Sequence, residues 1–236
     1  ARLAKMSTDA GASALLVFPS GVLAMGGERR PEMAEAHFQA VASASDLPLI
    51  CFNYARWTNL AYPLETIIRL AEKIPSLKAI KDWTAEPMEH ERNIRTLQSL
   101  TRPINVLTTN SAWLMASLSM GANGLLSGAG SIIPDLQVAM FQAIQRGDLN
   151  TARALNDRMQ PITQAFYAPP FLDMHNRMKE AAVLLGRQDR AVVRPPLVKI
   201  PESEIQRIDA ALKQGRISHD GADELDLVAM TGLAAE

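Results

Sequence analysis

The chain has 236 residues, of which 47% are hydrophobic and 21% charged, and its formal net charge at pH 7 is -1. This composition is typical of a globular domain that can bury a core, and it lacks the strong positive charge of a nucleic-acid-binding surface. With Cys51 as its single cysteine, the chain cannot form an internal disulfide, and no apolar run is long enough to span a bilayer. We therefore expect a cytoplasmic protein without nucleic-acid or membrane partners.

A strand–helix alternation occupies the first half of the chain, after an initial helical pattern that stops at Gly11. The predicted strands are residues 14–19, 48–53, 77–82, 105–110 and 124–128. The predicted helices between them are residues 32–43, 64–73, 89–100 and 112–120. Strands joined by helices pair in parallel through right-handed crossovers, so the fold class is α/β. The pattern alone leaves two arrangements open, an incomplete eight-stranded barrel and a doubly wound open sheet.

After Pro134 the alternation ends and only helical patterns follow. The predicted helices are residues 136–146, 149–166, 174–185 and 202–214. We predict a sheet region over residues 1–134, a helical C-terminal region over residues 135–215 and a flexible tail over residues 216–236, which lacks a sustained apolar stripe.

Lys81 is the candidate nucleophile, because it lies in the otherwise apolar strand pattern of residues 77–82 (LKAIKD). Lysine is among the side chains that are least often fully buried. Burial would lower its pKa, and the neutral amine could then attack a carbonyl carbon and form a Schiff base. The structural alternative is a lysine whose amine reaches from the strand end into solvent.

Four sequence runs resemble the dihydrodipicolinate synthase and N-acetylneuraminate lyase family in order and spacing. They are residues 47–53 (LPLICFN), 77–82 (LKAIKD), 121–127 (GANGLLS) and 193–197 (VRPPL). The resemblance extends from residue 1 to about residue 215. It implies a (β/α)8 TIM barrel with a helical C-terminal region, commonly a homotetramer, in which a barrel lysine forms a Schiff base with pyruvate or another 2-oxo acid. Lys81 matches that lysine.

In this register residue 1 falls in the third barrel helix, so the first three strands of the barrel are missing from the sequence. The loop that holds the substrate carboxylate in the family belongs to that missing part. We interpret the sequence as part of a longer chain, because a five-stranded remnant would leave apolar parallel edges open.

The chain departs from the family pattern at three places. Phe52 stands where the typical member has a tyrosine that relays protons, and a phenyl ring can neither donate nor accept a proton. Trp57 stands at the position of the arginine that binds the distal carboxylate in dihydrodipicolinate synthase, although Arg56 is only one residue away. Residues 20–27 replace a pair of tyrosines. We therefore do not expect a true dihydrodipicolinate synthase.

The register places the amine of Lys81 near Phe52, Thr109 and Leu126, and these three residues together with Arg56 are the predicted substrate contacts. The hydroxyls near Thr109 could bind a hydroxylated substrate or simply satisfy local turns. The four histidines have no metal-ligand spacing, and the glycines of residues 128–130 lack the rest of a dinucleotide fingerprint. We therefore propose no metal and no cofactor.

Two functional classes remain. The first is a class I Schiff-base lyase of the aldolase or dehydratase type that acts on pyruvate or another 2-oxo acid. The alternative is a non-catalytic 2-oxo-acid-binding or structural barrel protein that has lost the proton relay, which Phe52 and Trp57 favour. The retained lysine favours the enzyme, since leucine at position 81 would relieve the cost of burying an amine. In either case we expect a homo-oligomer, a dimer or tetramer.

Overall fold

The computed structural model describes residues 1–223. These residues form two compact units. The first contains residues 1–110 and 117–126, and the second contains residues 111–116 and the residues from Ser127 onward. Within the described residues no helix is long and apolar enough to cross a membrane.

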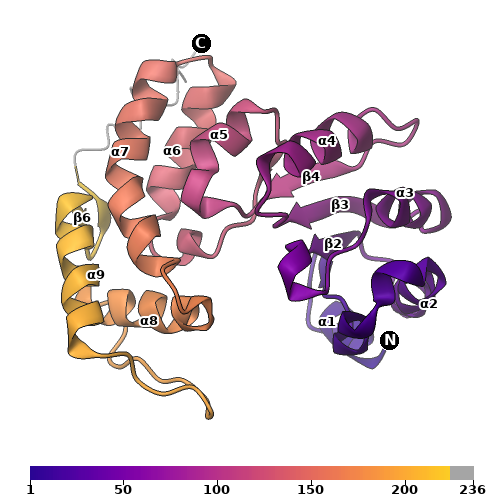
Figure 1. Cartoon of the computed structure of the whole chain (residues 1–236), viewed down its shortest axis with the longest axis horizontal. Coiled ribbons are helices and arrows are strands. Elements are labelled where there is room, and N and C mark those ends of the chain that lie inside the picture. The colour runs from indigo at the N-terminus through magenta and orange to yellow at the C-terminus, as the bar shows by residue number, and fades with distance from the viewer. Residues whose placement is uncertain (224–236) are drawn as a thin grey trace. The chain divides into compact units, whose positions relative to one another are not determined.

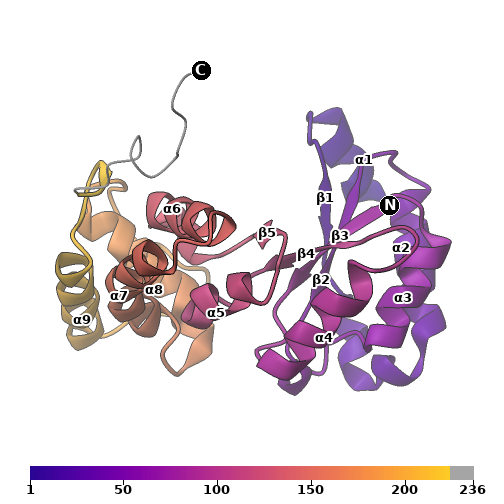
Figure 2. The same cartoon turned by 90° about the horizontal axis from the view of Figure 1, so that it is seen from above.

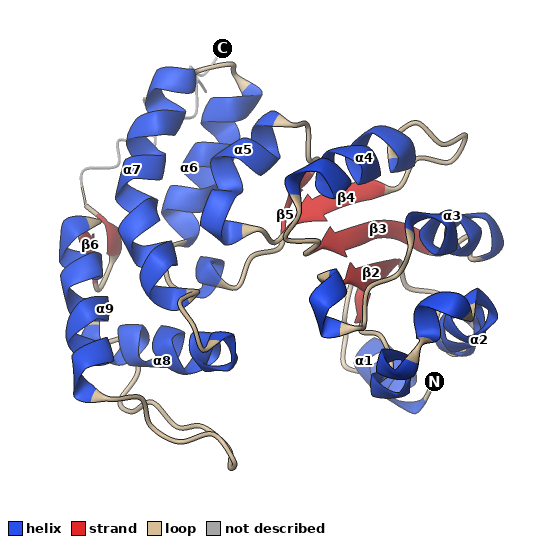
Figure 3. Ribbon diagram, in the orientation of Figure 1, coloured by secondary structure: helices blue, strands red, loops and turns tan. Residues whose placement is uncertain are grey.

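The first unit is built on a five-stranded parallel sheet (Figures 1 and 3). Its strands are β1 (Leu15–Val17), β2 (Leu49–Asn53), β3 (Leu77–Asp82), β4 (Asn105–Thr108) and β5 (Gly124–Leu125). All neighbours are parallel, and the strands follow one another in chain order. A doubly wound sheet would reverse its order at a switch point, whereas consecutive order is that of a (β/α)8 barrel. The prediction of consecutive barrel units is confirmed.

Helices alternate with the strands along the chain, beginning with a helix before β1. They are α1 (Arg2–Asp9), α2 (Pro31–Ala42), α3 (Leu64–Lys73), α4 (Pro87–Leu97) and α5 (Leu114–Ser119). Short 3-10 helices lie at Gly21–Met25, Gly27–Arg29, Arg56–Thr58 and Ser111–Trp113. Helices α2, α3 and α4 lie along one face of the sheet (Figure 2). The core of the unit lies at that face.

Side chains alternate between the two faces along each strand, and this alternation separates the core from the candidate site. Cys51, Ile80 and Val106 are completely buried, as are Ile67 and Leu70 of α3. Each such apolar side chain stabilises the fold by about 1.5–3 kcal/mol. Because of the two-residue period, the side chains next to Ile80 along β3 point to the opposite face, which α2–α4 do not cover.

The second unit is mainly helical. It contains α6 (Pro134–Gln145), α7 (Leu149–Phe166), α8 (Met174–Leu184), α9 (Glu202–Gln214), 3-10 helices at Ala129–Ser131 and Phe171–Asp173, and the antiparallel hairpin β6 (Ile217–Ser218) and β7 (Gly221–Ala222). Arg177 is fully buried, and its guanidinium binds the Glu204 carboxylate at 2.6 Å and the Ala168 carbonyl at 2.6 Å. This side chain therefore ties α8 to α9 and to the turn after α7.

The predicted flexible tail, residues 216–236, is only partly described. Ile217–Ser218 and Gly221–Ala222 form the hairpin, and residues 224–236 lie outside the described part.

Candidate active site

Lys81 lies near the carboxyl end of β3, between the adjacent strands β2 and β4. It pairs with Phe52 on one side and with Leu107 on the other. Paired residues of neighbouring strands point to the same face, so these three side chains form one row across the face opposite α2–α4. Within the row, Lys81 Nζ lies 4.3 Å from the centroid of the Phe52 ring.

The amine of Lys81 has an unusual environment for a charged group. It is half-buried, and this burial lowers the pKa of Lys81 below its usual value of 10.5. The face of the Phe52 ring attracts the ammonium form and opposes part of that change. Among residues 1–223 no carboxylate or hydrogen-bond acceptor pairs with this amine. The lysine therefore lacks the partner that would keep it firmly protonated.

Thr109 and Leu126 lie just beyond the ends of β4 and β5. The Thr109 N–H donates to the Asp82 carbonyl at 3.0 Å, and the Leu126 N–H donates to the Thr108 carbonyl at 2.9 Å. These bonds continue the parallel ladder past the assigned strands. Thr109 is two positions beyond Leu107, and Leu126 is two positions beyond Gly124, which pairs with Leu107. The structure thus brings Phe52, Lys81, Thr109 and Leu126 to one edge of the sheet.

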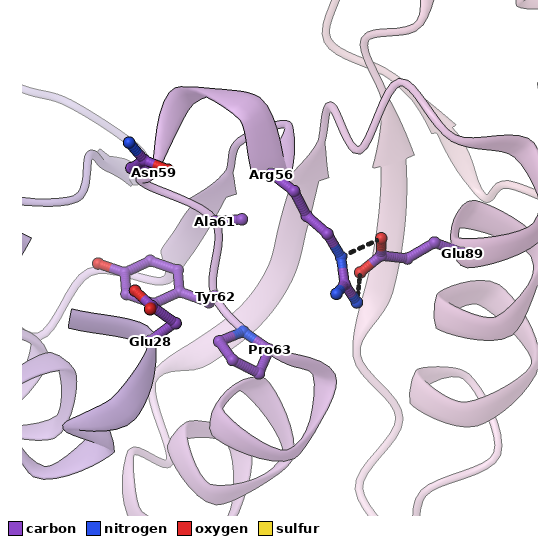
Figure 4. Close-up of a pocket in the computed structure, with 7 residues that line it drawn as sticks. All are labelled: Glu28, Arg56, Asn59, Ala61, Tyr62, Pro63 and Glu89. Carbon is purple, nitrogen blue, oxygen red and sulfur yellow. Dashed lines mark hydrogen bonds and ion pairs between the residues drawn. The ribbon is translucent and has the colours of Figure 1, made fainter. Parts of the chain in front are cut away.

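Arg56, the fourth predicted substrate contact, is bound to a carboxylate of α4. Its guanidinium makes a two-pronged ion pair with Glu89 of α4, at 2.8 Å through Nε and 2.9 Å through Nη2 (Figure 4). These hydrogen bonds, together with the charge of Glu89, raise the pKa of Arg56. A pocket of about 220 Å³ adjoins the pair and is lined by Glu28, Arg56, Asn59, Ala61, Tyr62, Pro63 and Glu89. Substrate binding by Arg56 would have to replace the contact with Glu89.

Sequence reasoning missed a cluster of five aromatic rings that begins beside Lys81. From the Phe52 ring, the centroid of Tyr54 is 4.2 Å away and that of Phe18 is 5.2 Å away. The cluster continues from Tyr54 to Trp83 over 5.6 Å, and from Trp83 to Trp57 over 5.3 Å. We call these five residues the aromatic cluster. In the described chain Trp57 is 64% exposed and Phe18 is 51% exposed.

Asp82, next to Lys81 in sequence, belongs to a buried polar chain on the opposite face. Its carboxylate contacts His90 Nδ1 at 2.7 Å, and His90 Nε2 contacts the Ser117 hydroxyl at 2.7 Å. All three residues are completely buried. Asn53 and Asn93 donate further hydrogen bonds to the same carboxylate, at 3.4 and 3.3 Å. This buried polar chain of side chains anchors the end of β3, and with it Lys81, to α4.

The second unit has a hydroxyl cluster of its own. Ser111 and Ser127 are joined through their hydroxyls at 2.5 Å, and the Tyr167 hydroxyl donates to Ser111 at 3.1 Å. The Ala129 N–H donates to the Tyr167 oxygen at 3.1 Å. Burial raises the pKa of Tyr167, so its phenol stays protonated and remains a donor. Within residues 1–223 no group of three or more His, Cys, Asp or Glu side chains could hold a metal ion.

The fold is that of solved structures of dihydrodipicolinate synthase type. A prophage protein of the dihydrodipicolinic acid synthase family from E. coli, solved in complex with pyruvate, has a TM-score of 0.78 at 24% identity, covering 91% of this chain and 70% of that one. Dihydrodipicolinate synthase from Thermotoga maritima has a TM-score of 0.77 at 20% identity, with the same coverage of both chains.

Curated relatives agree with the structural likeness. The 4-hydroxy-tetrahydrodipicolinate synthase of Neisseria meningitidis serogroup C is 32% identical over 177 residues, covering 75% of this chain and 58% of the relative. That of Maridesulfovibrio salexigens is 26% identical over 221 residues, covering 89% of this chain and 68% of the relative. The chain thus spans between 58% and 68% of the length of these two relatives. The profile of the dihydrodipicolinate synthetase family matches residues 2–215, and the chain belongs to that family.

Proposed function

We propose that the native protein is a Schiff-base-forming lyase that acts on pyruvate or another 2-oxo acid, with Lys81 as its nucleophile. One observation carries the proposal: a half-buried amine without a counter-ion in the described chain, near the carboxyl end of a barrel strand. In (β/α)8 enzymes this end of the strands is where active sites lie. The relatives named as synthases, and the structural neighbour described in complex with pyruvate, support the same chemistry.

The proposed chemistry begins with attack of the neutral Lys81 amine on the ketone carbon of the 2-oxo acid. Loss of one water gives a protonated imine, which withdraws the electron pair of a neighbouring bond as that bond breaks. In aldol cleavage the C4 hydroxyl loses its proton, the bond between C3 and C4 breaks, an aldehyde leaves and an enamine remains; protonation of the enamine carbon then restores the imine. In dehydration, loss of a C3 proton gives the enamine, which expels the C4 hydroxyl as water and becomes a conjugated imine. In both routes hydrolysis of the imine releases the product and restores the amine. The lowered pKa of Lys81 increases the fraction of neutral amine available for the first step.

The protein is proposed not to be a true dihydrodipicolinate synthase. Phe52 lies under the amine at the position where the resemblance places a proton-relaying tyrosine, and Arg56 is bound to Glu89. The same position of Phe52 supports the second candidate function, a barrel protein that binds 2-oxo acids without turning them over.

Borohydride trapping distinguishes these functions. Native protein incubated with pyruvate and borohydride should gain the mass of the reduced pyruvate adduct, and Lys81→Ala should not gain it. Lys78→Ala is the matched control, because Lys78 lies in the same strand but is exposed, and it should be labelled like the native protein. An adduct without turnover of any 2-oxo acid would favour the binding protein. Absence of an adduct, or an undiminished adduct in Lys81→Ala, would contradict the proposal.

Two further properties stay predictions. Assembly into a dimer or tetramer is expected from the resemblance, and mass photometry of the native protein would measure it. A cytoplasmic location is expected from the composition, and fractionation of cells would test it.

A further inference from the structure

We propose that Asp82 is a positioning residue for the reaction of Lys81, and that the buried groups bound to it fix the place of the amine relative to the neighbouring strands. The inference rests on the proposed Schiff-base function and adds a residue that acts through Lys81 and not on the substrate. It is carried by hydrogen bonds from β2, from α4 and from the segment after β4, which all converge on the residue that follows Lys81.

The carboxylate of Asp82 links β3 to a strand and to a helix. Its Oδ1 accepts from the Asn53 amide of β2 at 3.4 Å. Its Oδ2 contacts His90 Nδ1 at 2.7 Å and accepts from the Asn93 amide at 3.3 Å, and both of these partners lie in α4. The second nitrogen of His90 contacts the Ser117 hydroxyl of α5 at 2.7 Å. Both oxygens of the carboxylate are therefore held in place, each by a different element.

The main chain of Asp82 is held as well. Its carbonyl accepts from the Thr109 N–H at 3.0 Å and from the Asn110 amide at 3.3 Å, and both donors lie just beyond the end of β4. Because a planar peptide unit joins Lys81 to Asp82, the backbone of Lys81 has little freedom to shift while these contacts persist. We call the six residues whose side chains take part the Asp82 network: Asn53, Asp82, His90, Asn93, Asn110 and Ser117.

Stability alone does not explain the Asp82 network. Its side chains are at most 3% exposed, and all six lie in the first unit. Apolar side chains of similar volume would avoid the cost of burying a carboxylate, and such replacements are often neutral or stabilising. The amide oxygens of Asn93 and Asn110 have no hydrogen-bond partner within residues 1–223, so both amides donate to Asp82 while their own acceptors stay unpaired. We infer that the network is kept because it fixes geometry.

Fixed geometry matters for imine formation because the amine has to approach the ketone carbon at short range and along a defined direction. A displacement of about 1 Å can lower a rate about a hundredfold. The Asp82 network joins the ends of the strands that carry Phe52 and Lys81 to the segment that carries Thr109. Its loss should therefore lower the rate of imine formation more than the affinity for the 2-oxo acid.

Asp82→Asn tests this role with almost no change in volume. An amide has one oxygen, so when that oxygen stays toward His90, the new NH2 group faces the NH2 group of Asn53 and the link to β2 is lost. The measurement is the rate of borohydride trapping as a function of pyruvate concentration. The variant should lower the maximal rate about ten- to hundredfold, while the pyruvate concentration for half of that rate changes less than about threefold.

A compensating substitution distinguishes positioning from general damage. In the double variant Asn53→Asp with Asp82→Asn, the carboxylate stands on β2 and accepts from the amide on β3. Its other oxygen continues to accept from the Tyr62 N–H, as Asn53 Oδ1 does at 3.0 Å. Because one donor faces one acceptor again, the maximal rate should return to within about fivefold of the native value.

Leu97→Ala is the control for lost stability. Leu97 is completely buried in α4, and its truncation removes packing but no hydrogen bond of the Asp82 network. At a temperature where circular dichroism shows each variant to be folded, Leu97→Ala should keep the native maximal rate. Ser117→Ala, which removes only the outermost hydroxyl, should be slower than Leu97→Ala, and it replaces Asp82→Asn in the comparison if that variant does not fold.

An unchanged maximal rate in Asp82→Asn, an equal loss in Leu97→Ala, or no recovery in the folded double variant would overturn the inference. If Ser117→Ala has to serve as the test, a maximal rate equal to that of Leu97→Ala would overturn it. Pyruvate trapping that is as fast in Asp82→Asn as in the native protein refutes only the positioning role. No trapping of any 2-oxo acid by the native protein refutes the Schiff-base function and with it this inference.

Discussion

At the scale of single residues, the central feature is the balance of forces on the amine of Lys81. Burial disfavours the ammonium form, and the face of Phe52 favours it. The pKa of Lys81 is lowered, with burial as the cause. A group whose charged form is disfavoured in the folded state lowers the free energy of unfolding at any pH at which it is charged in that state.

Lys81→Met should make the native protein more stable at pH 7. With the pKa lowered on folding, the unfolded state binds more protons than the folded state at pH values between the lowered pKa and about 10.5, so the stability of the lysine form rises with pH through that window. The advantage of methionine should therefore shrink between pH 7 and pH 10 in urea unfolding experiments. The exposed Lys78→Met is the control, with a change within about 0.5 kcal/mol. A methionine variant that is less stable at pH 7 would mean that the Phe52 contact is the stronger effect.

Phe52→Tyr should raise the turnover of 2-oxo acids. A phenol at this position would be able to relay protons beside the imine, and general acid–base catalysis is worth about a hundredfold or more in rate. We expect an increase in kcat of at least about tenfold in steady-state assays of the native protein. Phe171→Tyr, in the second unit, should have no effect on kcat. An unchanged or reduced kcat in Phe52→Tyr would show that another group already serves as the relay.

At the scale of elements, the end of β3 is fixed by the buried chain of Asp82, His90 and Ser117. The aspartate follows Lys81 directly, so the hydrogen bonds that hold its carboxylate also restrict the backbone that carries the lysine. Along β3, the apolar core residue Ile80 is thus followed by the proposed nucleophile Lys81. Asp82 comes next and is held by hydrogen bonds on the helix side of the sheet.

His90→Ala should destabilise the fold strongly. It leaves the completely buried Asp82 carboxylate without its 2.7 Å partner, and removal of one member of a buried ionic or hydrogen-bonded pair costs about 3 kcal/mol. The free energy of unfolding in urea measures the loss. Met88→Ala, at an exposed position of the same helix, should stay within about 0.5 kcal/mol of the native value. Equal free energies of unfolding for the two variants would show that the buried polar chain contributes little to stability.

Several element boundaries were predictable from hydrophobic periodicity, but three helix starts were placed too late. The predicted helices began at residues 32, 89 and 136, whereas α2, α4 and α6 begin at Pro31, Pro87 and Pro134. Proline lacks an N–H and suits the first helical position, where that group would have no partner. Periodicity detects the apolar stripe inside a helix but not this entry residue.

The candidate site was predictable only where a strand pattern carried it. Lys81 is an exception within an apolar run, and Phe52 occupies the matching place in the preceding strand. The aromatic cluster was missed because Tyr54 follows the end of β2 and Trp57 lies in a short 3-10 helix, so neither belongs to a periodic apolar pattern. Their contacts with Trp83 depend on how the segments after β2 and β3 fold. His90 was missed for the same physical reason, since its contact with Asp82 depends on the docking of α4 against the sheet.

At the scale of the whole molecule, the family match over residues 2–215 and the consecutive parallel strands agree on the fold. The separation of the chain into two units has a local cause: the strand–helix alternation supplies a parallel sheet, whereas the elements described between Pro134 and residue 223 are helices and a short hairpin. Lys81, which is proposed to carry the chemistry, and the aromatic cluster beside it all lie in the first unit.

Identification of the labelled lysine tests the central claim most directly. Native protein is treated with a 2-oxo acid and borohydride, digested with trypsin and sequenced by tandem mass spectrometry. Reduction of the imine blocks cleavage after Lys81, so the adduct should appear on a peptide that begins after Lys78 and reads through Lys81 into Asp82 and Trp83. The account predicts the reduced ligand on Lys81. An adduct on any other lysine, with Lys81 unmodified, would contradict it.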